Sequence, residues 1–311
     1  MLGRSEPADG LTSPQIPWVW STKLFSRGGA SCMPDRRFLI AVPILGVLGF
    51  VAFLAASLLA VDATAAGTRA RIDRTIKDPA IVESSGLARS WLNPHRLWTH
   101  NDSGGGSTLY AIGERGRTVA KYELVNARHW DWEAMASAKR HGVSYLWVGD
   151  IGDNAAQKSS IFVHRIREPR PDARNGSRNP LSYELKYPDG SHDAEALLVR
   201  PGSLRMFVVS KVKNGPGHIY AAPRHPSQRH PNRLRRVGTA PSVVTDGVFL
   251  NRHRFVLRGY GSAWVYRTLG ATPRQFSLPD TGESIAVSPR KGYVLTGSEG
   301  LRSDIWRVRV P

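Results

Sequence analysis

The chain has 311 residues, with 43 Lys and Arg against 25 Asp and Glu, so its formal net charge at pH 7 is +18. Its one cysteine, Cys32, precedes the long apolar segment described next. This excludes a fold held by disulfide bonds and a thiolate metal site beyond that segment, and the positive charge favours polyanionic partners.

The first predicted element is an uncharged apolar segment at residues 38–61, preceded by Arg36 and Arg37. About 20 apolar residues cross the hydrocarbon core of a bilayer as a helix, so this segment predicts a transmembrane anchor. The arginine pair predicts a cytoplasmic N-terminus. We therefore expect a disordered cytoplasmic tail at 1–37 and a linker at 62–68.

Two alternatives to an uncleaved anchor stay open. Ala63-Thr64-Ala65 matches the A-x-A pattern of a signal-peptide cleavage site, and cleavage after Ala65 would give a secreted protein. A buried core helix is the other alternative, which the lack of further helical patterns disfavours. With an anchor the protein is a single-pass protein of the cell membrane with its following domain outside. Anionic lipid headgroups and phosphate-bearing wall polymers are the polyanions in that location, which argues against nucleic acid.

A short pattern recurs five times beyond residue 80: an oxygen-bearing side chain, followed by small and apolar residues that begin a strand. The five copies are ESSGLA (83–88), DWEAMA (131–136), DAEALL (193–198), VTDGVF (244–249) and TGESIA (281–286). An internal repeat of about 40 to 50 residues in a strand-rich sequence is typical of β-propeller blades. Each copy therefore predicts the first strand of one blade.

Short runs of β-branched and aromatic residues, separated by Gly, Pro and Asn, predict further strands after each copy. The third copy continues with strands at 205–211, 217–223 and 234–240. The fifth copy lacks a fourth strand, whereas the segment 69–76 has no partner of its own. We expect this N-terminal strand to complete the last blade and close the ring, which removes exposed sheet edges. The predicted fold of residues 69–311 is an all-β, five-bladed β-propeller, with a β-sandwich as the alternative.

The third position of each copy lies at the start of an innermost strand, so five oxygen-bearing side chains should meet at one mouth of the central channel. Carboxylates that lie so near to one another require shifted pKa values or a cation. An all-oxygen ring suits a hard cation, and Ca²⁺ tolerates such a ring better than Mg²⁺. Strand-end caps around a water-filled channel are the alternative, and zinc has less support. The predicted metal ligands are Ser85, Glu133, Glu195, Asp246 and Glu283.

Polar loops between the second and third strands of each blade should surround the same mouth. In a hydrolase, the cation would polarise a phosphoryl oxygen or activate a water. Basic loop residues would neutralise phosphate charge, and carboxylates would orient or deprotonate the water. The candidate catalytic residues are Asp102, Asp150, Asp153, Lys211 and Arg258. Charged propeller loops are also common without catalysis, so the pattern leaves open whether the protein is an enzyme.

These motifs resemble those of known propellers. The ring, with one oxygen ligand per blade, is similar to the central calcium site of the calcium-activated nucleotidases (apyrases), and the segment 100–112 resembles their Asp-rich loop. The motifs ESSGLA, HND, DWE, GDIGDN and YPDG-x-x-DAEAL more closely resemble exported bacterial five-bladed propellers of unassigned activity. A relation to phytase-like propellers is looser. The resemblance covers most of residues 70–311 and implies one Ca²⁺ in the channel of a five-bladed propeller.

Two predicted connections on the opposite face, at 167–180 and 223–236, are rich in Arg and Pro. The linker should reach the propeller on this face. A tethered disc would then rest its arginines on anionic lipid or wall polymer. Basic loops in solvent are the alternative.

Three functions from different classes are consistent with these features. The first is a membrane-tethered, extracytoplasmic propeller that binds a ligand or partner over a calcium-filled channel. The second is a calcium-dependent hydrolase of phosphoesters, as in apyrase- or phytase-like propellers. The third is a cell-envelope scaffold without a small-ligand site. The sequence shows no Ser-His-Asp arrangement, P-loop or dinucleotide fingerprint.

Overall fold

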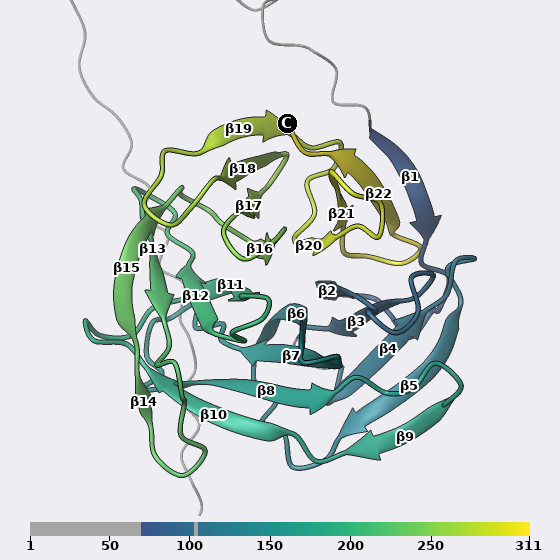
Figure 1. Cartoon of the computed structure of the whole chain (residues 1–311), viewed down its shortest axis with the longest axis horizontal. Helices are drawn as coiled ribbons and strands as arrows, with labels where there is room; N and C mark the ends of the chain where they lie inside the picture. Colours follow the sequence, from purple (N-terminus) through teal and green to yellow (C-terminus); the bar gives the residue numbers. More distant parts are fainter. Residues whose placement is uncertain (1–69, 103–104) are drawn as a thin grey trace, which may run out of the picture. The chain divides into compact units, whose positions relative to one another are not determined.

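The computed structural model describes residues 70–102 and 105–311, and the regular elements in this part of the chain are all β-strands. They form five sheets, which Figure 1 shows as blades around a central axis. The innermost strands of neighbouring blades contact one another around the whole ring. The predicted five-bladed β-propeller is confirmed. Within the described ranges no helix is long and apolar enough to cross a bilayer, and the predicted tail, transmembrane segment and linker lie outside them.

Each blade is built outward from the channel, with its first strand innermost. Blade 1 contains β2 (Ser84–Arg89), β3 (Leu97–Asn101), β4 (Thr108–Ile112) and β5 (Thr118–Leu124). Blade 2 contains β6 (Trp132–Arg140), β7 (Val143–Asp150), β8 (Ile161–Arg167) and β10 (Leu181–Lys186). Blade 3 contains β11 (Ala194–Val199), β12 (Met206–Ser210), β13 (Gly217–Ala221) and β15 (Arg235–Ala240). Blade 4 contains β16 (Asp246–Phe249), β17 (Phe255–Gly259), β18 (Ser262–Tyr266) and β19 (Arg274–Ser277). Blade 5 contains β20 (Ser284–Val287), β21 (Tyr293–Gly297) and β22 (Asp304–Arg309).

The fourth strand of blade 5 comes from the start of the described chain. β1 (Ala70–Thr75) pairs antiparallel with β22 as the outermost strand of this blade. Thr75 Oγ1 and Asp304 Oδ1 form a hydrogen bond of 2.5 Å across the two strands. Asp73 accepts hydrogen bonds from Arg307 and, at 2.9 Å, from Arg74 Nε. The predicted closure by an N-terminal strand is confirmed.

Replacing Asp73 by Asn should weaken this closure, because the Asp73 side chain is only 6% exposed and would leave both arginines without their carboxylate. We expect a loss of about 1–3 kcal/mol in the free energy of unfolding. Burial alone would raise the pKa of Asp73, but hydrogen bonds from Arg307 and Arg74 outweigh it and lower the pKa below 3.8. The stabilisation is therefore present above about pH 4 and is lost as the pH falls through the lowered pKa. Denaturant titrations of both proteins at pH 7 and pH 3 should show the difference at pH 7 and a smaller one at pH 3; equal differences would contradict it.

The two Arg- and Pro-rich connections do not remain loops throughout, which corrects the sequence expectation. β9 (Asn175–Arg178) lies in the first and pairs in parallel with β5 of blade 1. β14 (Asn232–Arg233) lies in the second and pairs in parallel with β10 of blade 2. Each connection thus reaches back to cover the outer edge of the preceding blade. The outermost strand of a blade exposes unpaired N–H and C=O groups, and a long connection can satisfy them.

The core lies between adjacent blades. The described residues form five buried apolar clusters, and each corresponds to one interface between neighbouring blades. Trp98 and Trp132 pack between blades 1 and 2, and Trp147 packs between blades 2 and 3. Close packing on both sides holds each innermost strand in place, so side chains at the starts of these strands have well-defined positions.

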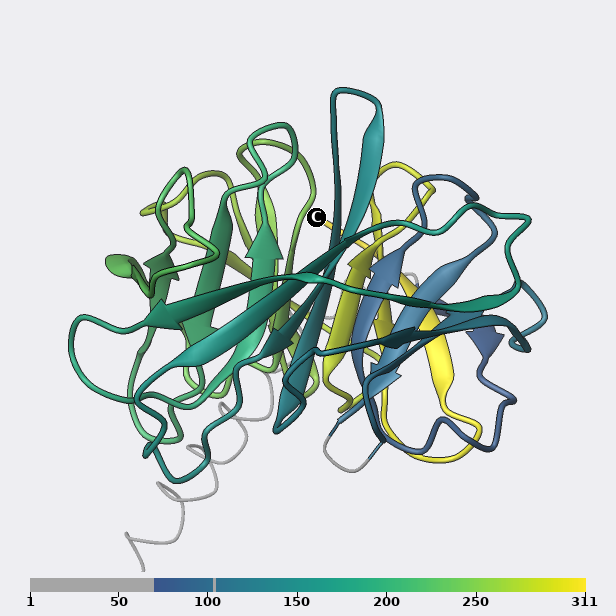
Figure 2. The ribbon, with the colours of Figure 1, turned by 90° about the horizontal axis from the view of Figure 1, so that it is seen from below.

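Strand alternation gives the disc two different faces. We call one the mouth face; it carries the loops between the second and third strands of each blade and the connections into the innermost strands (76–83, 125–131, 187–193, 241–245 and 278–283). We call the other the turn face; it carries the turns between the first and second strands (90–96, 141–142, 200–205, 250–254 and 288–292). Figure 2 shows the disc from the side, with the β6–β7 hairpin projecting at the top, on the turn face. Ala70 and Pro311 also lie on the turn face, since they adjoin Val308 and Arg254.

Candidate functional site

The five predicted ring residues occupy equivalent places at the starts of the innermost strands. Ser85, Glu133 and Glu195 are the second residues of β2, β6 and β11. Asp246 is the first residue of β16, and Glu283 directly precedes β20. All of them except Glu283 are buried. The repeat in the sequence therefore corresponds to one position per blade on the mouth face.

β-Bulges distinguish the first three ring residues from the other two. The pairing of β2 with β3 skips Ser85, that of β6 with β7 skips Glu133, and that of β11 with β12 skips Glu195. In blades 4 and 5 the register runs through Asp246 and Ser284 without a shift. A bulge leaves its extra residue outside the ladder and changes the direction of its side chain. Blades 1 to 3 thus release their ring residues from regular strand pairing.

Ser85 and Asp246 use their oxygens in hydrogen bonds between neighbouring blades. Ser85 Oγ donates to the backbone oxygen of Glu133 at 2.9 Å. Asp246 accepts hydrogen bonds from Gly247 N at 2.7 Å and from Ile285 N at 2.8 Å, one with each carboxylate oxygen. Burial raises the pKa of Asp246 well above its ordinary value, although both amides act in the opposite direction. These contacts are of the kind expected for strand-end caps, which the sequence analysis gave as the alternative to calcium ligands.

Glu195 and Glu283 are joined across blades 3, 4 and 5 by a chain of polar contacts. Lys211 Nζ lies 2.6 Å from Glu195 Oε1 and 3.4 Å from the hydroxyl of Tyr260. The Tyr260 hydroxyl donates to Glu283 Oε1 at 2.7 Å. Burial raises the pKa of Glu195 to about 7, although Lys211 opposes the shift. Lys211 therefore balances part of the negative charge on this side of the mouth.

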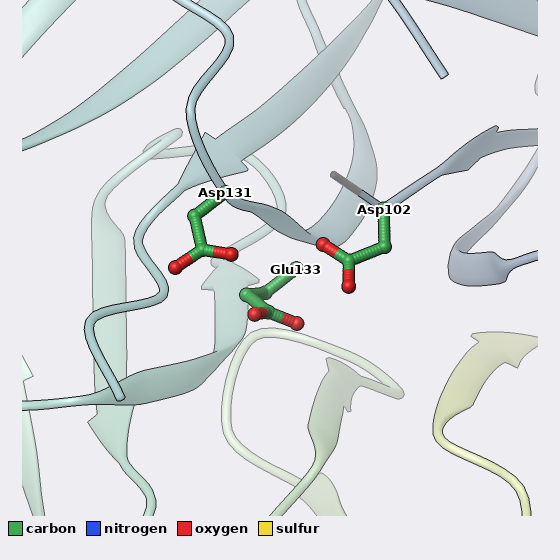
Figure 3. Close-up of side chains that lie close together, drawn as sticks. All are labelled: Asp102, Asp131 and Glu133. Carbon is green, nitrogen blue, oxygen red and sulfur yellow. The ribbon is translucent and has the colours of Figure 1, made fainter. Parts of the chain in front are cut away.

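Three carboxylates gather on the other side of the mouth. Asp102 follows β3, Asp131 directly precedes β6, and Glu133 occupies the bulge of β6. One oxygen from each lies within 4.8 Å of the others, and Figure 3 shows the three carboxyl groups around one small region. We call these residues the carboxylate cluster. Such an all-oxygen group is of the kind that binds a hard divalent cation.

The GDIGDN segment at 149–154 fixes the backbone of Asp131. Asp150 Oδ1 accepts a hydrogen bond from Asp131 N at 2.8 Å. Ile151 N and Gly152 N both donate to the backbone oxygen of Asp131, at 3.2 and 3.3 Å. Asp150, a candidate catalytic residue, thus lies behind the cluster and holds one of its members in position.

Gly152 provides the space in which two of the carboxylates lie. A Cβ atom at this position would be 2.5 Å from Glu133 Oε1 and 2.6 Å from Asp131 Oδ2. These separations are shorter than van der Waals contact, so any side chain at residue 152 would displace the cluster. Lys158 Nζ, 3.2 Å from Asp131 Oδ2, is a neighbouring cation.

Glu133 is the cluster member whose carboxylate is most disfavoured in its charged form. Its side chain is 4% exposed, and no hydrogen-bond donor to its carboxylate is found among the residues that the structure describes. Burial, followed by the charges of Glu195, Asp102, Asp131 and Glu283, raises the pKa of Glu133 to about 10. In the metal-free protein Glu133 therefore carries a proton at neutral pH.

Two further candidate catalytic residues have structural contacts. Asp153 accepts hydrogen bonds from Gln157 N at 2.9 Å and Lys158 N at 2.7 Å, which closes the loop after β7. Arg258 is fully buried; it donates to Ser284 O at 2.7 Å and pairs with Asp280 Oδ1 at 2.7 Å. Arg258 therefore ties blade 4 to blade 5 beneath the mouth.

A hollow of 250 Å³ lies beside the ring in blade 5. Its lining includes Tyr260, Glu283 and Glu299. Burial, followed by the charge of Glu283, raises the pKa of Glu299 to about 7. The mouth thus holds two carboxyl groups, Glu195 and Glu299, each of which gains or loses a proton near neutral pH.

Asp131 was not among the residues singled out from the sequence, although its motif was. A signal for it exists: in the first three repeats an acidic residue, Glu83, Asp131 or Asp193, stands two positions before the ring residue. In the fourth and fifth repeats the same position holds Val244 and Thr281. The acidic position therefore accompanies the three bulged strands.

Fold and site together define a five-bladed β-propeller with a carboxylate cluster at one channel mouth. No family model and no curated protein matches the chain. Among solved structures, the chain is similar to a gluconolactonase from Xanthomonas campestris, with a TM-score of 0.43 and 12% sequence identity over 77% of this chain and 88% of that chain. A similarity of this extent supports no statement about activity.

Proposed function

We propose that this propeller is a calcium-binding module that holds a ligand or partner over its mouth, with Asp102, Asp131 and Glu133 as protein ligands of the ion. The observation that carries the proposal is the convergence of three carboxylates, one of them buried and without a hydrogen-bond donor among the described residues. Ionising a buried carboxyl group that has no partner costs several kcal/mol, and a bound divalent cation would offset that cost. Glu195 and Glu283 add negative charge around the ion, while Ser85 and Asp246 hold neighbouring inner strands.

Calcium suits this cluster better than other metals. The three ligands offer only oxygen atoms, which disfavours zinc. Asp102 comes from a loop, Asp131 from the residue before β6 and Glu133 from the bulge of β6. Ca²⁺ accommodates such an irregular set of ligands through its flexible coordination, whereas Mg²⁺ requires a near-ideal octahedron. Water or a ligand oxygen would complete the coordination shell.

Exposed apolar side chains on the mouth face support binding of a further molecule. Val82, Trp130, Tyr260 and Leu301 belong to connections of this face and are large, exposed apolar residues. Trp130 is 57% exposed, and the Arg128 guanidinium lies 4.0 Å from the centre of its ring. Aromatic residues and Arg are enriched where proteins bind partners. The mouth face therefore carries groups suited to contact a ligand.

The proposal keeps the location predicted from the sequence. Residues 38–61 would tether the propeller to the cell membrane as a single-pass anchor, or a cleaved signal would release it outside the cell. The Arg-rich segments 167–180 and 223–236 would contact anionic lipid or wall polymer. The described chain begins on the turn face, which would direct the mouth face away from the membrane.

Calcium-dependent hydrolysis of phosphoesters is the second candidate function. It is favoured by Glu195 and Glu299, because burial raises the pKa of each to about 7. Such groups can act as general acids or bases at neutral pH, and Lys211 could neutralise phosphate charge. Hydrogen bonding of Asp150, Asp153 and Arg258 to the fold favours binding as the main function.

Thermal unfolding tests the proposal and separates the two functions. We expect the melting temperature of the chain to rise when calcium replaces a chelator, because a ligand of the native state stabilises it by about 2.7 kcal/mol at 100 times its Kd. A phosphoester screen under both conditions should show no turnover. A calcium-dependent turnover would favour the hydrolase, and the absence of any shift with calcium would overturn the binding proposal.

Replacing Gly152 by Ala should weaken calcium binding without unfolding the protein, because the new Cβ would displace Glu133 and Asp131. We expect the calcium affinity to fall by roughly tenfold or more, since one lost charge-assisted contact has that effect. Gly238→Ala is the matched control, as a Cβ there meets Ile219 at an ordinary 3.6 Å. Equal calcium affinities of the two variants would contradict the assignment.

A further inference from the structure

The turn face, opposite the carboxylate cluster, contains a hollow of 370 Å³. The turns of blades 1 to 4 contribute to it, so it lies at the other end of the channel axis. Its lining residues are Trp91, Lys139, Arg140, His141, Pro201, Gly202 and Arg252. A volume of this size falls within the range of small-molecule sites.

The hollow is built by backbone conformation and by one contact between turns. His141 and Gly142 form the two-residue turn of the β6–β7 hairpin, with φ of 48° and 77°, which suits a tight hairpin turn. Gly202 N donates to Lys139 O at 3.1 Å, which joins the turn of blade 3 to this hairpin. A Cβ at Gly202 would lie 3.2 Å from Arg252 Nε, so the glycine leaves the Arg252 side chain its place.

Trp91 is held rigidly at the edge of the hollow. Its backbone N donates to Glu168 Oε2, and its indole Nε1 donates to Ser137 Oγ, both at 3.1 Å. The Arg89 guanidinium lies 4.1 Å from the centre of its ring, and Lys139 Nζ lies 5.8 Å away. The Trp91 ring therefore lies close to two cations, Arg89 and Lys139, at the edge of the hollow.

The positive charge of the hollow is not balanced locally. Among the residues that the structure describes, no carboxylate lies within 4.0 Å of the charged atoms of Lys139, Arg140 or Arg252. Glu168, which holds Trp91, also accepts hydrogen bonds from Trp98 Nε1 and Ser144 Oγ. The charge of Glu168 acts on Arg89, and Glu168 forms no ion pair within 4.0 Å with Lys139, Arg140 or Arg252 among the described residues.

Further cations extend this field over the turn face. Burial, followed by the charge of Arg224, lowers the pKa of Arg200, which belongs to the same turn as Gly202. The turn of blade 5 carries Arg290 and Lys291. Clustered like charges disfavour one another unless an anion lies between them.

We infer that the hollow binds a multiply charged phosphate group. Lys139, Arg140 and Arg252 can donate several charge-assisted hydrogen bonds to phosphate oxygens, and arginine matches that geometry with two parallel bonds. The group could belong to a free phosphate compound or to an anionic lipid headgroup. This site is independent of calcium at the mouth face, because the two lie at opposite ends of the channel.

Calorimetric titration of the full chain in non-ionic detergent tests the inference with two probes: inorganic pyrophosphate, and micelles that contain phosphatidylglycerol. We expect saturable binding of at least one probe. The double variant Lys139→Gln/Arg252→Gln should weaken the binding of that probe by roughly tenfold or more. The single variant Arg140→Gln should also weaken this binding. Binding of pyrophosphate assigns a free phosphate ligand, and binding of the micelles alone assigns a headgroup.

The control is Lys77→Gln/Lys213→Gln, which removes the same charge from exposed positions of the mouth face and should change the affinity less than twofold. Melting temperatures of all variants establish that each is folded. The inference is overturned if neither probe binds, or if the control weakens binding as much as the variants of the hollow do.

Discussion

Replacing Glu133 by Gln is expected to make the metal-free protein more stable at alkaline pH and to abolish its response to calcium. The pKa of Glu133 is raised to about 10 from an ordinary 4.5, so between these values the folded chain holds a proton that the unfolded chain releases. Stability from this group is full below about pH 4.5 and is lost as the pH rises toward 10, by at most about 1.4 kcal/mol per pH unit. Gln has no such proton, so the variant should gain about 4 kcal/mol over the wild type between pH 5 and pH 8.

Denaturant titrations in chelator at several pH values measure this difference. The control is Glu83→Gln, which removes an exposed carboxylate of the mouth face and should follow the wild type. A constant difference between Glu133→Gln and wild type across this pH range would show that burial does not hold a proton on Glu133. Retained calcium stabilisation in the variant would remove Glu133 from the ion's ligands.

Replacing Arg258 by Met is expected to destabilise the propeller by about 3–5 kcal/mol, the usual result of removing one partner of a buried ion pair. Arg258 is fully buried, and it donates to Ser284 O and Gly297 O of blade 5 as well as to Asp280. Among the described residues, its loss would leave the Asp280 carboxylate with Gly282 N and Thr296 Oγ1 as its remaining donors. Because these contacts cross between blades 4 and 5, the variant should unfold at lower denaturant concentration.

A double-mutant cycle separates the ion pair from packing. Asp280→Asn in the Arg258→Met background should cost much less than in the wild type, because the charge it removes is already unpaired. Arg267→Met, at an exposed position, is the control and should change stability by less than about 0.5 kcal/mol. A small effect of Arg258→Met, or additive effects in the cycle, would contradict the interblade role of this arginine.

The fold could be predicted because the sequence repeats its inner strands. Five copies of one motif marked five blades, and a surplus strand at 69–76 matched the strand missing after β22. The pairing of β9 and β14 with preceding blades could not be predicted in this way. Both lie in Arg- and Pro-rich segments with weak strand propensity, and their parallel pairing depends on which sheet edge is left open in three dimensions.

The positions of the ring residues in the fold could be predicted, but their contacts could not. Periodicity placed Glu133 and Glu195 at the mouth, whereas the bulges that distinguish them from Asp246 depend on the register between strands, which the repeat does not encode. Asp131 joins the cluster because the backbone of Gly152 and the carboxylate of Asp150 hold it there. The sequence places Arg258 beside a polar loop, which suggested an exposed position. In the structure Arg258 is fully buried and is bound to Ser284 and Asp280.

Calorimetric titration of calcium into the metal-free chain at pH 7.5, in two buffers with different ionisation enthalpies, tests the central claim most directly. Calcium bound by Asp102, Asp131 and Glu133 should saturate and displace about one proton, because a ligand must be deprotonated to coordinate and the pKa of Glu133 is about 10. The apparent enthalpy should therefore differ between the buffers, and Glu133→Gln should show neither binding nor proton release. No saturable binding by the wild type, or equal binding by the variant, would contradict a calcium site in the carboxylate cluster.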